Sequence, residues 1–124
     1  MDERLNKALE TANLLRTHQN QKEQLKIRAK QNLLHSTKGG VFEIDSHLIT
    51  LVKTLIDSGY DEAVIPDRNF NPIKITDVED FYEDILGRWS EVMNDYFVEY
   101  EKLKKSRTVK KVIGAEGGDK EDKQ

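Results

Sequence analysis

Two long stretches, one at each end of the chain, carry apolar residues at helical spacing. In the first stretch, leucine and alanine recur every three or four residues over 5–15 and again over 25–33. This spacing is the period of one helical face. We predict a helix over residues 2–37, followed by the glycine pair at 39 and 40, where a left-handed C-terminal cap is favoured.

Between these two apolar clusters the first helix has a polar gap. No apolar residue occurs from Arg16 to Gln24. Packing in the middle of this helix is therefore expected to be loose, or to be mediated by His18, Gln19 and Lys22. Coiled coils tolerate such polar stretches at a cost in stability, sometimes to fix the register or the oligomeric state.

The middle of the chain combines short β-prone runs with one short helix. Residues 41–44 form a predicted strand, and an apolar stripe at helical spacing predicts a helix over 46–58, with Asp45 as a candidate N-cap. Two apolar runs on either side of a polar loop predict a β-hairpin over 62–75. Because Pro72 cannot donate a ladder hydrogen bond, we expect it at a strand start or on an outer edge.

The last helix has the clearest start signal in the sequence. Thr76, followed three residues later by Glu79, matches a capping box and predicts a helix over 77–113. One apolar row runs along 78–103, and a second row lies beside it, so this face is expected to contact two neighbours. Gly87 costs about 1 kcal/mol relative to alanine within a helix. We therefore expect either a closely packed neighbour at Gly87 or a bend.

These elements predict an α+β protein that is mainly α. The expected architecture is two long antiparallel helices in a coiled-coil-like hairpin, with a small β-α-β-β head, and residues 1–113 form a single domain. Antiparallel pairing is favoured because it brings the basic residues of 22–30 near the acidic residues of 77–84. Residues 114–124 lack the apolar side chains that offset the entropy cost of ordering, and are predicted to be disordered.

Composition and charge narrow the class of protein further. Of the 124 residues, 36% are hydrophobic and 35% are charged, which is typical of extended helices or coiled coils, and the absence of cysteine excludes disulfides and thiolate metal sites. No apolar run resembles a signal peptide or a membrane anchor, so we expect a cytoplasmic protein with no membrane partner. The net charge of −3 is the sum of +4 over 1–40, −11 over 41–101 and +4 over 102–124.

The wide face of the last helix is the first candidate binding surface. Aromatic and long apolar side chains anchor partners as hot spots, although at helical spacing they are first of all core residues. The candidate residues are Tyr82, Leu86, Trp89, Met93, Tyr96, Phe97 and Tyr100. A core role and a binding role coincide if the core is itself an interface between chains. The expected partner is therefore a second copy of the chain, in a homo-oligomer, or another protein.

A basic run near the end of the last helix is the second candidate. Six basic residues within 102–111 can release counterions from nucleic acid. The candidate nucleic-acid-binding residues are Lys104, Lys105, Arg107, Lys110 and Lys111. The plainer interpretation is a basic helix end favoured by the helix dipole, and the absence of interleaved aromatic residues gives no support for base stacking. Binding to nucleic acid or to a transcription complex is therefore the alternative to a role in protein assembly.

The sequence contains no catalytic, cofactor or metal-binding signature. The histidines His18, His35 and His47 are dispersed, have no nucleophile at a recognisable spacing, and are expected to be surface or capping residues. The Glu-x-x-His motif of carboxylate-bridged metal bundles is absent. We therefore expect no enzyme, no cofactor, no metal and no small-molecule substrate.

The third interpretation is an enzyme, which would require a cleft in the β-α-β-β head. The residues available to line it are Asp45, His47, Asp67 and Asn69.

Three segments carry a resemblance to a known group of proteins. They are Gly40-Val41-Phe42, residues 64–73 with the sequence VIPDRNFNPI, and residues 99–107 with the sequence EYEKLKKSR. Together, within residues 40–110, they resemble small uncharacterised proteins of large tailed bacteriophages. The resemblance implies a phage protein that works in the infected cell or within the particle, and it implies no catalytic residue.

Overall fold

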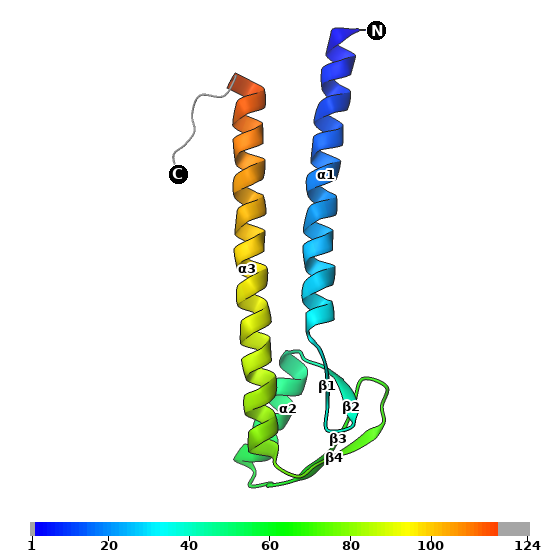
Figure 1. The fold of residues 1–124 in the computed structure, drawn as a ribbon, viewed down its shortest axis with the longest axis vertical. Coiled ribbons are helices and arrows are strands. Elements are labelled where there is room, and N and C mark those ends of the chain that lie inside the picture. Colours follow the sequence, from blue (N-terminus) through cyan, green and yellow to red (C-terminus); the bar gives the residue numbers. More distant parts are fainter. Residues whose placement is uncertain (1, 117–124) are drawn as a thin grey trace. The chain divides into compact units, whose positions relative to one another are not determined.

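A computed structural model describes the backbone of residues 2–116 and the side chains of residues 2–106. The elements in chain order are α1 (Glu3–Asn32), β1 (Leu34–Thr37), β2 (Gly40–Glu43), α2 (Ser46–Asp57), β3 (Ala63–Pro66), β4 (Pro72–Ile75) and α3 (Val78–Glu116) (Figure 1). Within the described range there are three helices and two antiparallel sheets of two strands each. The predicted fold class, α+β and mainly α, is confirmed.

The chain divides into two compact units. Unit 1 comprises Met1–Ile27 and Tyr96–Gln124, which are the first part of α1 and the last part of α3. Unit 2 comprises Arg28–Asp95 and contains both sheets, α2 and the remaining turns of the two long helices.

In unit 2, α1 ends at Asn32 and not at residue 37 as predicted. Residues 34–37 instead form β1, which pairs with β2 so that Thr37 lies opposite Gly40. Residues 38 and 39 have φ angles of 56° and 87°, as the central residues of a type I′ hairpin turn require. Lys38 and Gly39 therefore form a hairpin turn, and the glycine pair does not cap a helix. Residues 34–37 form a strand and not a helix because pairing gives the backbones of β1 and β2 hydrogen-bond partners. Local helix propensity does not reflect this pairing.

The other predicted elements of unit 2 lie within one or two residues of their expected positions. Oδ1 of Asp45 accepts a hydrogen bond from the Leu48 amide at 2.8 Å, so the N-cap of α2 is confirmed. The β3–β4 hairpin pairs Pro66 with Pro72 at its open loop end. Pro72 thus stands at a strand start, as expected for a residue without an amide donor.

The cap of α3 is Asp77 and not Thr76. Oδ1 of Asp77 accepts from the Asp80 amide at 3.0 Å, which satisfies one of the unpaired amides at the helix start. At its other end the helix includes residues 114–116, where disorder was predicted. The rest of that predicted segment, 117–124, lies outside the described residues.

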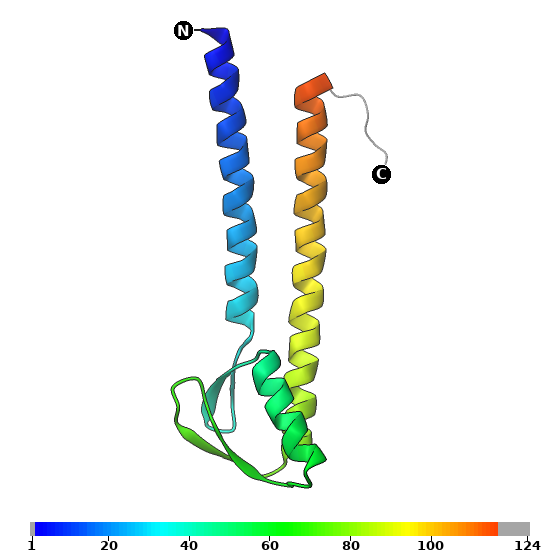
Figure 2. The ribbon, with the colours of Figure 1, turned by 180° about the vertical axis from the view of Figure 1, so that it is seen from behind.

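The core of unit 2 lies between the start of α3, the two hairpins and α2. The largest fully buried side chains are Phe42, Phe81, Ile44, Ile65, Ile75, Ile85, Val52 and Val78. The rings of Phe42 and Phe81 meet edge to face, with centroids 5.0 Å apart, a preferred aromatic geometry. In both side views α2 lies alongside the first turns of α3 (Figure 2). The part of the first α3 row that lies in unit 2, from Val78 to Val92, is therefore mostly core, with Trp89 half-buried.

Candidate interaction site

Within unit 2 the predicted partner-binding face of α3 is partly covered by the unit itself. Tyr82, Trp89 and Met93 are half-buried, and Leu86 is exposed. The Lys53 ammonium of α2 lies 5.8 Å from the centroid of the Tyr82 ring, within cation–π range. An intramolecular neighbour thus occupies part of the surface that the sequence assigned to a partner.

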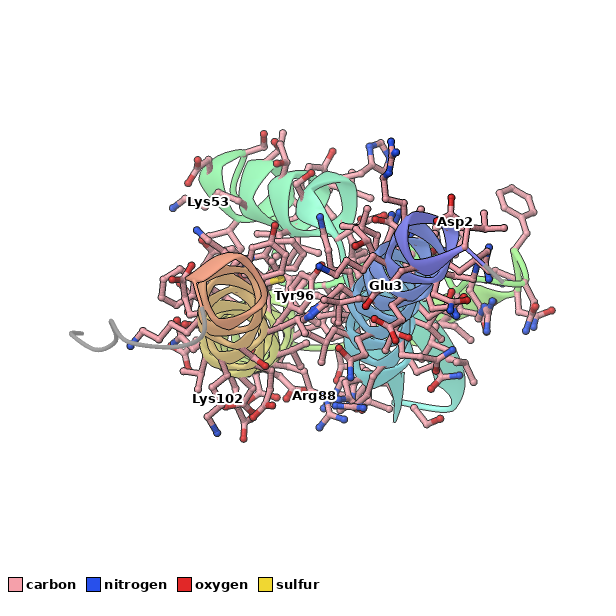
Figure 3. The ribbon with its side chains drawn as sticks, turned by 90° about the horizontal axis from the view of Figure 1, so that it is seen from above. Asp2, Glu3, Lys53, Arg88, Tyr96 and Lys102 are labelled. Atoms are coloured by element: carbon pink, nitrogen blue, oxygen red, sulfur yellow. The ribbon has the colours of Figure 1, made fainter. Side chains whose placement is uncertain are left out.

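Within unit 1 the same face divides into two sides. Tyr96 and Tyr100 are half-buried, and Figure 3 shows Tyr96 on the side of α3 that faces α1, with Lys102 on a different side. The Lys22 ammonium of α1 lies 5.8 Å from the centroid of the Tyr100 ring. Phe97, one residue after Tyr96, is exposed. Tyr100 therefore contacts α1 and Tyr96 faces it, whereas Phe97 is left for another neighbour.

Unit 1 has no buried apolar side chain among the residues whose side chains are described. Its large apolar residues with 41% to 62% of their surface exposed are Leu5, Leu9, Leu15, Ile27, Phe97 and Val98. Leu5 and Leu9 are four residues apart and lie on one face of α1. Helices in stable bundles bury an apolar stripe, so the two helical segments of unit 1 leave apolar surface uncovered.

Two lysines in the described part of the basic segment are paired with neighbouring glutamates. Lys104 lies 3.6 Å from Glu101, and Lys102 lies 3.4 Å from Glu99. Lys105 is exposed. The side chains of the other three candidates, Arg107, Lys110 and Lys111, lie outside the described residues. Both pairs lie within α3 and are accessible to solvent, and such surface pairs contribute little to stability.

The loop between β3 and β4 is organised by Asp67, which the sequence did not single out for this role. Its side chain is 8% exposed and accepts hydrogen bonds from the amides of Val41 at 3.1 Å, Asn69 at 2.9 Å and Asn71 at 2.9 Å. The bonds from Asn71 and Val41 lower the pKa of Asp67 from 3.8, although burial acts in the opposite direction. The available signal was an Asp with Asn two residues later, a typical Asx-turn pattern.

Asp45 and Asp67, the two carboxylates considered for an enzyme cleft, both accept hydrogen bonds from backbone amides. Asp45 caps α2, and Asp67 binds the amides of its own loop and of β2. His47 and Asn69 are exposed. Among the residues that the structure describes, no group of three or more His, Cys, Asp or Glu side chains is placed to bind a metal ion.

Phe70 stands on the same loop with 82% of its surface exposed. Its φ angle is 62°, in the left-handed region that bulky residues rarely adopt. The Phe70 amide donates to the carbonyl of Asp67 at 2.9 Å, which closes the turn. The loop thus maintains an exposed aromatic ring on an unfavourable backbone conformation.

Among the side chains of unit 1 that the structure describes, His18 is the buried one, with 3% of its surface exposed. The prediction that it is a surface or capping residue is therefore wrong, because His18 lies on the side of α1 that faces α3. Of the three residues expected to mediate packing there, His18 and Lys22 line a cavity of about 200 Å³ together with Tyr100, Leu103 and Lys104, whereas Gln19 is exposed. Neither ring nitrogen of His18 has a hydrogen-bond partner.

No protein-family model, curated protein or solved structure matches this chain. In the part of the chain that the structure covers, no helix combines the length and the apolar character needed to cross a lipid bilayer.

Proposed function

We propose that this protein is a non-enzymatic assembly module that binds a second copy of itself through the helices of unit 1. The proposal rests on the observation that unit 1 buries none of its described apolar side chains while several large ones stay about half exposed. A second pair of helices packed against this surface would bury it, as in a four-helix bundle. Unit 1 would then supply the antiparallel, coiled-coil-like helical hairpin predicted from the sequence.

A second copy is the favoured partner because both helical segments expose apolar residues. The α1 segment offers Leu5 and Leu9, and the α3 segment offers Phe97 and Val98. In a twofold dimer the α1 patch of each copy would pack on the α3 patch of the other, so that every contact occurs twice. Following the resemblance to phage proteins, we place this assembly in a phage particle or an infected cell.

The test is the oligomeric state of the full chain and of a Leu9→Gln variant. Fully burying a leucine contributes about 1.5–3 kcal/mol, and Leu9 is already half covered. The variant should therefore lose about 1 kcal/mol per copy and about 2 kcal/mol per dimer, which raises the dimer Kd by roughly 30-fold. Sedimentation equilibrium and light scattering at tens of micromolar protein measure this change.

Asn20→Gln is the matched control. Asn20 is exposed and lies on the same face of α1 as Leu9, eleven residues further along. Exchanging one polar amide for another there should leave the Kd unchanged. A strict monomer at tens of micromolar would overturn the proposal, and equal losses in the two variants would overturn the assignment of this face.

The nucleic-acid alternative makes a different prediction. Binding to an oligonucleotide would weaken steeply between low and moderate salt. It would also be lost on replacing Lys104, Arg107 and Lys111 with glutamine. Self-association through apolar surface has neither property.

A further inference from the structure

His18 has hydrogen-bonding capacity that the protein does not use. A neutral imidazole carries one N–H donor and one acceptor nitrogen, and an imidazolium carries two donors. Both nitrogens of His18 are buried and lack a partner in unit 1. A buried polar group without a partner destabilises the folded state, so such groups call for an explanation.

The cavity beside this ring is lined by cations and contains no acidic residue. Lys22 and Lys104 contribute ammonium groups, and Tyr100 and Leu103 complete the lining. Lys22 also lies over the Tyr100 ring, and Lys104 also pairs with Glu101 at 3.6 Å. A cavity lined by one sign of charge concentrates ions of the opposite sign. With the Glu101 carboxylate counted against Lys104, the charge of Lys22 remains, so the lining favours an anion.

The size of the cavity restricts the anion further. Its volume of about 200 Å³ lies below the range of about 300–1,000 Å³ for drug-sized ligands. A water molecule occupies about 30 Å³ in the liquid, so the cavity has room for a group with a few oxygen atoms. A tetrahedral oxyanion directs acceptor oxygens to several sides and can receive charge-assisted hydrogen bonds from several donors together.

We propose that this cavity of unit 1 binds a small free oxyanion, with inorganic phosphate as the simplest ligand. The His18 ring, whose two nitrogens are buried, would turn toward the cavity to donate one hydrogen bond to the ligand, and Lys22 and Lys104 would neutralise its charge. The site uses none of the exposed apolar residues assigned to self-association, so the two proposals are independent.

The probe is inorganic phosphate titrated into the full-length, 15N-labelled protein at fixed pH, with sodium chloride added to keep the ionic strength constant. Two-bond nitrogen–proton spectra report the ring nitrogens of each histidine, and comparison with His18→Gln assigns the His18 signals. We expect the His18 signals to shift and to saturate. The signals of His35 and His47, which do not line the cavity, should stay unchanged.

Lys22→Gln and Lys104→Gln should each weaken phosphate binding at least tenfold. Lys26→Gln and Lys105→Gln are the matched controls, because both lysines are exposed and neither lines the cavity. Circular dichroism verifies that each variant is folded, and the two lining variants give independent tests.

Three results would overturn the proposal. The first is an equal His18 shift with chloride alone, which would be a general salt effect. The second is an equal loss of binding in the control variants. The third is a single-stranded oligonucleotide that shifts the His18 signals at a lower phosphate concentration than inorganic phosphate does, which would assign the site to nucleic acid.

Discussion

Replacing Phe70 with glycine should stabilise unit 2, because it removes an unfavourable backbone conformation. The φ angle of 62° at this position costs a residue with a Cβ about 1–2 kcal/mol, and glycine avoids that cost. Glycine also increases the entropy of the unfolded chain, which opposes the gain by about 0.5–1 kcal/mol. Since 82% of the Phe70 surface is exposed, losing the ring removes little burial. The expected net gain is about 0.5–1 kcal/mol.

Urea unfolding followed by the fluorescence of Trp89 measures this change. Trp89 is the single tryptophan of the chain and lies in unit 2. With a slope of about 2 kcal/mol per molar urea, the midpoint should rise by about 0.3–0.5 M. Phe70→Ala is the matched control, because it removes the ring and retains the strained backbone, so its midpoint should stay near that of the parent protein.

Two outcomes would refute this reasoning. A lower midpoint for both variants would show that the Phe70 ring stabilises the folded unit through contacts. A lower midpoint for Phe70→Gly alone would show that the left-handed conformation carries no strain that glycine relieves.

Three further substitutions test other parts of the structure. Gly87→Ala should raise the stability of α3 by about 1 kcal/mol in thermal unfolding, because an added Cβ meets nothing within 4 Å. Gly40→Ala should lower stability by about 1–3 kcal/mol in the same assay, because its Cβ would lie 2.8 Å from Cγ1 of Ile73 and 3.2 Å from Cβ of Asp67. Asp67→Asn should reduce stability at neutral pH. Because folding lowers the pKa of Asp67 from 3.8, its contribution to stability is fully present above that value and is lost as the pH falls through the folded pKa. Urea unfolding at several pH values should therefore show that the difference in the free energy of unfolding between this variant and the parent becomes smaller below pH about 4.

The helices were predictable from sequence because each has a strong local signal, whereas β1 was not. Leu34–Thr37 follows directly on a helical pattern, and a glycine after such a pattern indicates either a helix end or a hairpin turn. Only pairing with β2 decides between the two, and that partner lies beyond the local pattern. At Gly87 the sequence likewise left two explanations, a closely packed neighbour or a bend. An added Cβ at Gly87 would meet nothing within 4 Å, so a closely packed neighbour is excluded.

The composition of the candidate surface was predictable, but the exposure of its residues was not. Helical spacing placed Tyr96 and Phe97 on one wide face, and only the position of α1 within unit 1 separates the half-buried tyrosine from the exposed phenylalanine. The burial of His18 likewise depends on side chains of α3, some eighty residues away in sequence. Periodicity identifies a face, whereas the neighbours that cover it are set by tertiary contacts.

Asp67 has a consequence for how unit 2 opens to solvent. Each hairpin has two strands, and an isolated two-stranded hairpin is at best marginally stable in water. The Val41 amide of one hairpin donates to the Asp67 side chain, and the Arg68 amide beside the other donates to the Val41 carbonyl at 2.8 Å. Neither hairpin can separate from the unit without breaking hydrogen bonds of its neighbour. The amide protons at this junction should therefore exchange with solvent in a single cooperative event.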